Sequence, residues 1–126
     1  LLEEHIQLGN WVNAHLHGKT AAANMLGGHT PFRQVSFYTA QGFGTVIAFV
    51  GDVRVVEERT VITRGSLESG AVTRVILRDG EIEGATMVNR TQDLAPLSRL
   101  IEQNVKVEPI VDKLNDPSFD LRSLTA

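Results

Sequence analysis

The stretch AVTRVILRDGEIEGATMV, residues 71–88, contains a strong signal for a β-hairpin. Two segments rich in β-branched residues flank the pair Asp79-Gly80, which suits the positive φ angles of a type I′ turn between antiparallel strands. The stretch therefore predicts a β-hairpin. In its first segment the side chains alternate between two faces, as in a strand of an antiparallel sheet: Thr73, Val75 and Leu77 against Arg74, Ile76 and Arg78.

Other short segments of β-branched and aromatic residues surround this hairpin and extend the predicted sheet. Gly51-Asp52 is a second candidate for a tight turn, and residues 64–70 form a looser connection. Because the segments follow one another through short connections, we expect an antiparallel meander of about five strands. These strands are expected at residues 35–39, 45–50, 53–63, 71–78 and 82–88.

After the strands, the apolar spacing returns to that of helices. Asp93 suits the N-cap of a first closing helix, and Pro96 suits its first turn. A second, shorter helix is expected at residues 110–114, and the tail at residues 115–126 is expected to be an extended arm. The apolar side chains expected to pack in this region are Leu94, Leu97, Leu100, Ile101, Phe119 and Leu121.

The N-terminal part of the chain predicts a helix from about residue 3 to residue 26. One side of this helix is thin, since Gly18, Ala21 and Ala22 carry almost no side chain, and another backbone could approach it closely. Gly27-Gly28 should end the helix, because glycine readily adopts the left-handed conformation that follows a helix. The predicted fold class is α+β: an N-terminal helix, the meander, and one or two closing C-terminal helices.

Composition narrows the classes of function. The chain has 126 residues, of which 42% are hydrophobic and 21% charged, as is typical of one folded domain. Its net charge of −3, without a basic run, argues against a nucleic-acid partner. No apolar stretch approaches the roughly 20 residues that span a bilayer, so no membrane partner is expected. The lack of cysteine excludes disulfides and thiolate metal ligands and fits a reducing cytoplasm. The first residue is Leu1, which indicates either a processed protein or a piece of a longer one.

No catalytic or metal-binding motif is visible in the sequence. His15 and His17 are two residues apart and would point to different sides of a helix, whereas a helical metal pair needs i,i+3 or i,i+4 spacing. The run Gly18-Lys19-Thr20 lacks the earlier glycine of a phosphate-binding loop. The chain is therefore not expected to be an enzyme on its own.

Two clusters combine aromatic with polar or small residues. One is Gly9-Asn10-Trp11, and the other is SFYTAQGFG, residues 36–44, which contains Tyr38. Aromatic residues in such places most often belong to the core. The alternative is that both clusters line a flat aromatic ligand bound at a domain boundary.

The order and spacing of these motifs resemble the C-terminal part of FAD-dependent pyridine nucleotide–disulfide oxidoreductases. The branch is that of ferredoxin and rubredoxin reductases, NADH oxidases, the reductase part of nitrite reductases and apoptosis-inducing factor. The chain departs from the family pattern at Gly9, Val35 and Ala40, where glutamate, proline and aspartate are common. The resemblance rests on a helix motif (Trp11, Ala14, Gly18, Ala21, Ala22, Asn24 and Met25), an aromatic segment (Phe37, Tyr38, Thr39 and Gln41), AFVGD at residues 48–52, and residues 79–107.

The resemblance implies that residues 1–30 are the last helix of an FAD-binding domain and residues 31–126 a reductase C-terminal (interface) domain. The absent FAD- and NAD-binding domains would then be partners of this chain. The parent protein would transfer hydride from NAD(P)H to FAD and pass electrons to a redox protein or to oxygen. The fragment alone would be inactive.

For the site, the resemblance implies that Trp11 and Tyr38 form aromatic walls near the flavin and the nicotinamide. Gly9 and Asn10 would present backbone groups to the flavin ring. A helix N-terminus offers N–H groups and a partial positive charge, which would stabilise negative charge on the reduced ring. None of the four residues is expected to be a covalent catalyst.

The rival interpretation is an autonomous α+β interaction or dimerisation module without a cofactor. Its basis is the edge of the predicted sheet, because an exposed edge strand pairs readily with another chain. The sequence leaves a homodimer open under either interpretation.

Overall fold

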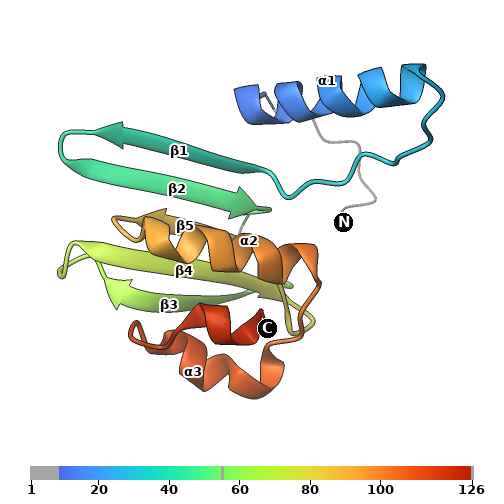
Figure 1. Ribbon diagram of the computed structural model, residues 1–126. Helices are drawn as coiled ribbons and strands as arrows, with labels where there is room; N and C mark the ends of the chain where they lie inside the picture. The colour runs from blue at the N-terminus through green and yellow to red at the C-terminus, as the bar shows by residue number, and fades with distance from the viewer. Residues whose placement is uncertain (1–8, 55, 126) are drawn as a thin grey trace. The chain divides into compact units, whose positions relative to one another are not determined.

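The protein is described by a computed structural model in which residues 9–54 and 56–125 are placed (Figure 1). The chain divides into two compact units, Leu1–Ser36 and Phe37–Ala126. Each unit is described separately below.

The first unit contains one helix, α1 (Trp11–Met25). The predicted start near residue 3 is wrong for Gly9 and Asn10, which are not helical; residues 3–8 lie outside the described part of the chain. Asn10 has an extended backbone (φ −127°, ψ 155°), and its side chain accepts a hydrogen bond from the N–H of Asn13. This is the geometry of an N-cap, and the helix can begin only after it.

The predicted glycine stop of α1 is confirmed. Gly27 has a φ of 96°, and its N–H donates to the carbonyl of Asn24 at 3.1 Å. The N–H of Gly28 donates to the carbonyl of Ala23 at 3.1 Å, which completes a Schellman motif. The side chain of Asn24 also exchanges two hydrogen bonds with the backbone of Thr30, each 3.0 Å long. Both ends of α1 are therefore capped by the chain's own groups.

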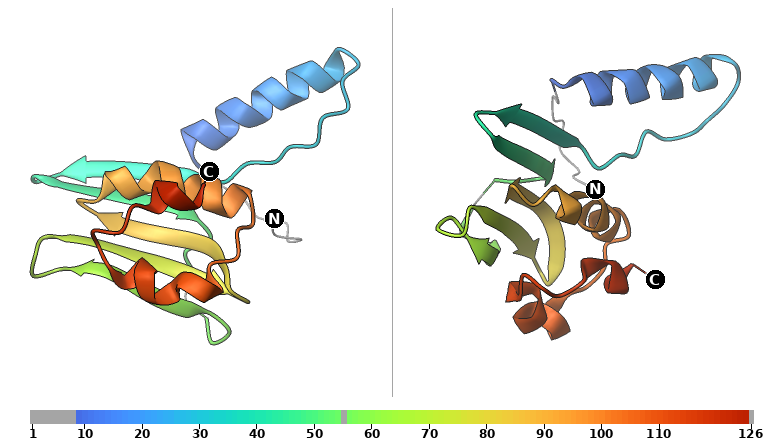
Figure 2. Two further views of the ribbon diagram at one scale, coloured as in Figure 1. Left: turned by 60° about the horizontal axis from the view of Figure 1, so that its bottom comes forward. Right: turned by 60° about the vertical axis from the view of Figure 1, so that its left-hand side comes forward.

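The second unit is a five-stranded antiparallel sheet with helices on one face (Figure 2). The predicted fold class is confirmed, and the Asp79-Gly80 turn is present with φ angles of 51° and 78°. The strands are β1 (Phe37–Gly42), β2 (Thr45–Gly51), β3 (Thr60–Ser66), β4 (Ala71–Arg78) and β5 (Glu81–Val88).

The strand order corrects the predicted meander. The order of the strands in the sheet is β1-β2-β5-β4-β3. Strands that follow one another in sequence are therefore paired only within β1–β2 and within β3–β4–β5, and β2 pairs with β5 instead of β3. This is a Greek-key arrangement, in which residues 52–59 carry the chain from β2 to the far edge of the sheet. Gly51-Asp52 does not form the predicted tight turn, because the N–H of Asp52 donates to the carbonyl of Glu83 in β5 at 2.8 Å.

The helix-covered face of the sheet holds the core. The closing helices are α2 (Leu94–Glu102) and the short α3 (Val111–Asn115); 3₁₀ turns η1 (Thr91–Asp93), η2 (Glu108–Ile110) and η3 (Leu121–Leu124) flank them. The predicted extended conformation of the tail is therefore wrong, since Leu121–Leu124 form η3, whereas the predicted packing of Leu121 is confirmed by its burial. The buried hydrophobic residues of the sheet and helices include Ala48, Val50, Ile62, Val75, Ala85, Met87, Leu97, Leu100, Leu114 and Leu121.

Candidate functional site

The N-terminal end of α1 is built around the side chain of Asn10. Its Oδ1 accepts from the N–H of Asn13 at 2.8 Å, and its Nδ2 donates to Oγ of Ser36 at 3.0 Å. The N–H groups of Trp11 and Val12 have no acceptor within the helix, because the first N–H groups of an α-helix have no carbonyl one turn before them. The first turn, residues 11–14, which lies wholly within the described part, contains no acidic side chain. The positive end of the helix dipole is thus not offset from within α1.

Trp11 stands outward at this end of α1. The residue is 78% exposed, and its ring stacks on that of His15 with centroids 5.4 Å apart and planes 11° apart. Gly9, the residue before the cap, is exposed, and a Cβ added there would meet no atom within 4 Å. The chain therefore places a small residue, Gly9, then the N-cap Asn10, and then the indole of Trp11 at the start of α1.

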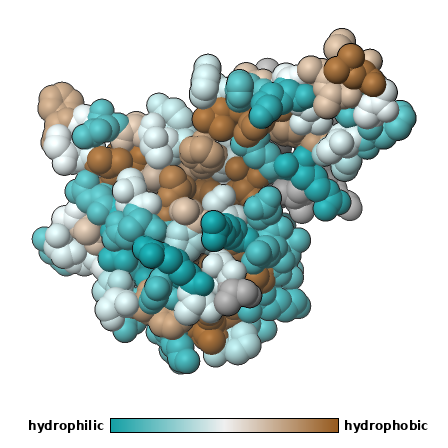
Figure 3. Space-filling view, viewed as in Figure 1, coloured by the Kyte–Doolittle hydropathy of each residue, from teal (hydrophilic) through white to brown (hydrophobic). Residues whose placement is uncertain are grey.

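Tyr38 lies in the second unit, on the edge strand β1. All six residues of β1 are exposed, and Tyr38 is 54% exposed. It is paired with Phe49 of β2. Figure 3 shows apolar atoms at the surface on α1 and on the β1–β2 hairpin. An exposed aromatic side chain on an edge strand is more typical of a contact surface than of a core.

The four predicted site residues are thus divided between the units. Gly9, Asn10 and Trp11 form one group in the first unit, and Tyr38 belongs to the second. Across residues 9–54 and 56–125, no three His, Asp or Glu side chains gather as a metal-ligand group. Within the same residues, no helix is both long enough and apolar enough to cross a bilayer.

An ionic cluster at the β2–β3 crossover was not predicted. Oδ2 of Asp52 accepts from Nη2 of Arg54 at 2.7 Å and from Nη2 of Arg59 at 2.6 Å. These two hydrogen bonds hold the pKa of Asp52 well below its usual range, and the bond to Asp52 in turn raises the pKa of Arg59. Arg59 also pairs with Glu83 of β5 and donates to the carbonyl of Arg54. The cluster fixes the crossover against the sheet.

A second ionic cluster ties the C-terminal tail to the sheet. Arg64 of β3 has a buried side chain that donates to the carbonyls of Leu114 and Phe119, at 2.8 and 2.9 Å. Burial lowers the pKa of Arg64, and the nearby carboxylate of Asp93, 3.7 Å away, opposes that shift. Arg90 donates to the same carboxylate at 2.9 Å.

The place of Asp93 in this cluster corrects its predicted role. It precedes α2 but makes no side-chain capping bond, because its Oδ2 accepts from Thr73 at 2.7 Å and from Arg90. The sequence signal for the cluster was the arginine in a strand otherwise rich in β-branched residues. It was missed because residues 64–70 were interpreted as a loop.

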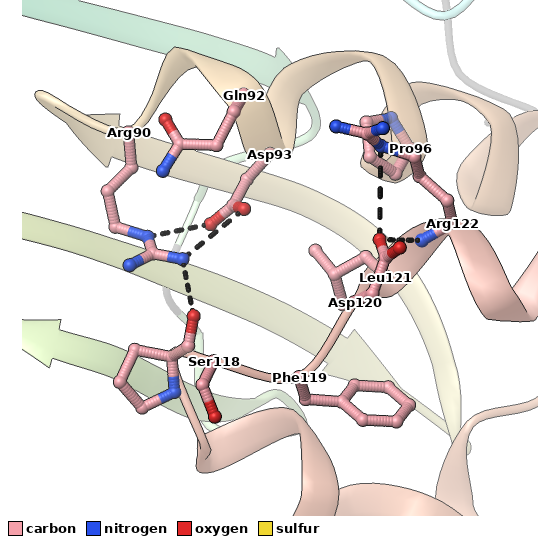
Figure 4. A pocket seen from close by; sticks show the side chains of 10 residues that line it. Arg90, Gln92, Asp93, Pro96, Ser118, Phe119, Asp120, Leu121 and Arg122 are labelled. Atoms are coloured by element: carbon pink, nitrogen blue, oxygen red, sulfur yellow. Dashed lines mark hydrogen bonds and ion pairs between the residues drawn. The ribbon is translucent and has the colours of Figure 1, made fainter.

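A polar pocket of about 280 Å³ lies beside this cluster (Figure 4). Arg90 closes one side of it by donating to Asp93 and to the carbonyl of Pro117. Arg122, which is largely exposed, pairs with Asp120 at 3.8 Å on another side. The charged groups that line the pocket are therefore paired with one another. We interpret the pocket as the place where the C-terminal tail packs beside the start of α2.

Comparison with known proteins shows to which family this architecture belongs. The family model described as "Reductase C-terminal" matches residues 37–125. The biphenyl dioxygenase system ferredoxin–NAD(+) reductase component of Paraburkholderia xenovorans is 30% identical over 93% of this chain. The benzene 1,2-dioxygenase system ferredoxin–NAD(+) reductase subunit of Pseudomonas putida is 28% identical, also over 93%. In both cases the chain spans only 28% of the relative's length.

Solved structures show the same fold. The ferredoxin reductase for the CYP199A2 system from Rhodopseudomonas palustris is 21% identical, with a TM-score of 0.79 over 98% of this chain and 30% of its own. The reductase in the covalent putidaredoxin reductase–putidaredoxin complex is also 21% identical, with a TM-score of 0.80 over 94% of this chain and 28% of its own. With its family model covering β1 through η3, the chain belongs to the reductase C-terminal family, found in the C-terminal part of ferredoxin reductases.

Proposed function

We propose that this chain is the C-terminal portion of an FAD-dependent NAD(P)H oxidoreductase whose electrons go to a ferredoxin-type redox protein or to oxygen. The observation that carries the proposal is the family match over residues 37–125 together with relatives that are ferredoxin–NAD(+) reductase components. Since the chain spans 28% of those relatives, the nucleotide-binding domains would be supplied by the rest of a longer protein. The cysteine-free chain suits a reducing cytoplasm, the compartment we assign to the reductase.

We assign residues 1–30 to the last helix of the FAD-binding domain and residues 31–126 to the interface domain. The exposure of the helix supports the first assignment. Gly18, Ala21 and Ala22 are all exposed, and a Cβ added at Gly18 would meet no atom within 4 Å. A thin face of this kind suits close approach by a neighbouring domain.

The N-terminal end of α1 fits the electron-rich edge of a flavin. FAD would supply the hydride-accepting ring and hand electrons on singly or in pairs. Gly9 and Asn10 would bring their backbone groups to the pyrimidine edge of this ring. The N–H groups of the first turn and the positive helix end would favour negative charge there, and the first turn contains no carboxylate to oppose it.

Trp11 and Tyr38 would act as apolar walls. Both residues are more than half exposed, and an aromatic ring offers a flat face to a planar ligand. By covering that ligand they would exclude water from the reacting edge and restrict its orientation. None of the four residues would form a covalent bond in the reaction.

The test is the intact mass and the visible absorption spectrum of the native protein, followed by anaerobic addition of NADH or NADPH. We expect a mass several times 13.8 kDa and flavin bands that bleach on addition of the nucleotide. Reoxidation by a ferredoxin, compared with reoxidation by oxygen, then identifies the acceptor. The isolated 126-residue chain should consume no NADH.

A colourless native protein with a mass near 13.8 kDa would contradict the proposal and favour the autonomous module. NADH consumption by the isolated chain with stoichiometric flavin would contradict the prediction that the fragment is inactive.

A further inference from the structure

The hydrogen bond between Asn10 and Ser36 joins the start of the first unit to its end. Twenty-six positions separate the two residues, and the 3.0 Å bond between Nδ2 of Asn10 and Oγ of Ser36 is partly buried. Ser36 is the last residue of the first unit, and β1 begins at the next residue. The bond therefore acts at the point where the chain passes from one unit to the other.

The direction of this bond is fixed by the capping bond beside it. The backbone N–H of Asn13 can only donate, so the atom of Asn10 that it meets at 2.8 Å must be the amide oxygen. The amide nitrogen then faces Ser36, whose hydroxyl oxygen accepts. One side chain thus caps α1 and holds the segment that leads into β1.

Ser36 is close in the chain to one of the proposed flavin walls. Tyr38 follows it by two residues, and both residues after Ser36 belong to β1. Asn10, whose side chain makes the bond, directly precedes Trp11, the other proposed wall, in the sequence. Trp11 and Tyr38 therefore each lie within two residues, along the chain, of a residue that makes this hydrogen bond.

We propose that Ser36 is a positioning residue: by accepting the hydrogen bond from Asn10, it fixes where the strand that carries Tyr38 leaves the first unit. The inference rests on the proposed function, since the placement matters for the flavin that Trp11 and Tyr38 would cover. Ser36 itself touches neither cofactor nor substrate in this role. Its loss would loosen the walls without removing any flavin-facing group.

The experiment measures the rate constant for flavin reduction by NADH in the native holoenzyme by stopped flow. Ser36→Ala and Ser36→Val should each lower it about three- to tenfold, which is the value of one hydrogen bond between neutral groups. Ser36→Thr, which keeps the hydroxyl and matches valine in shape, should restore most of the rate. Ser69→Ala, which removes a hydroxyl bonded within the β3–β4 turn, is the control and should leave the rate unchanged.

A second variant separates linking from capping. Serine caps a helix about as well as asparagine but is too short to span to Ser36. Asn10→Ser should therefore slow reduction to the same extent as Ser36→Ala. The double variant should be no slower than either single one, as expected when both remove the same contact.

The outcomes distinguish the two proposals. A yellow wild type that NADH reduces, with Ser36→Ala as fast as wild type, would overturn the positioning role and leave the proposed function standing. An additive double variant would overturn it as well. A colourless wild type would overturn the proposed function and, with it, the role toward flavin. Amide hydrogen exchange at residues 34–38 then still decides whether the bond holds the junction: unchanged exchange in Ser36→Ala would show that it does not.

Discussion

Helices α1 and α2 show two ways of stabilising a helix in one chain. Of the 15 residues of α1 only Asn13 is buried, whereas the 9 residues of α2 include three buried ones, among them Leu97 and Leu100 with no exposed surface. In compensation, α1 is capped at both ends by side-chain and Schellman hydrogen bonds. Helix α2 is therefore held by side chains buried within the second unit, whereas α1 depends on hydrogen bonds at its own two ends.

The largest expected loss of stability is at Arg64, in the second unit, to which α2 belongs. Arg64→Ala should lower the free energy of unfolding by about 4 kcal/mol, because it leaves the carbonyls of Leu114 and Phe119 without their donor and weakens the pairing of Asp93. Urea unfolding of the second unit measures this loss.

Arg74→Ala is the matched control for Arg64. Arg74 is exposed on the neighbouring strand, opposite Thr63, and its loss should cost under about 0.5 kcal/mol. Equal losses in the two variants would show that the buried contacts of Arg64 do not hold the tail.

The next effect tests the crossover at which β2 leaves β5. Gly51 has a φ of 68°, and a Cβ added there would overlap the carbonyl oxygen of Glu83. Gly51→Ala should therefore cost about 3 kcal/mol of the free energy of unfolding. Gly44→Ala, at a similar φ of 74° but with no atom within 4 Å of the new Cβ, should cost only about 1 kcal/mol. If both variants cost the same, backbone strain alone, and not the close approach of β5, explains Gly51.

The turns predicted at Asp79-Gly80 and at Gly51-Asp52 illustrate what the sequence could and could not predict. The Asp79-Gly80 hairpin and the bounds of β4 were predicted correctly, because turn chemistry and alternation are local properties. The order of the strands was not, because the same local signals allow Gly51-Asp52 either a hairpin or a crossover. The choice depends on Glu83, about 30 positions further along the chain.

Long-range partners also explain the errors at charged residues. Asp93 has the composition of an N-cap, yet Thr73 and Arg90 engage its carboxylate. At the candidate site, the spacing of residues located the start of α1 only approximately, because it did not identify Asn10 as the cap. The exposure of Trp11 and Tyr38 could not be read from periodicity, since an aromatic residue that faces another domain has the same pattern as one that faces a core.

A smaller effect concerns acid stability of the second unit. The pKa of Asp52 is lower in the folded protein than its ordinary value of 3.8, so the ionised form stabilises the fold. This contribution is complete above about pH 5 and is lost as the pH falls below the ordinary carboxyl value. Asp52→Asn should cost about 2 kcal/mol at pH 7, and the difference from wild type should shrink by about 1 kcal/mol at pH 3. Urea unfolding at both pH values measures it, and a difference that stays constant would refute the linkage to Asp52.

The smallest expected effect lies in α1 and asks whether its stability is local. Gly27 occupies the left-handed position after the helix with a φ of 96°, and a Cβ there would meet no atom within 4 Å. Gly27→Ala should therefore lower the free energy of unfolding of α1 by about 1 kcal/mol through backbone conformation alone. The stability of the sheet should not change. Amide hydrogen exchange should speed up about fivefold in α1, as about 1 kcal/mol implies, and remain unchanged in β4 and β5. Faster exchange in the sheet would mean that the two units unfold together, and the contrast between a helix held by its caps and one held by its core would then fail.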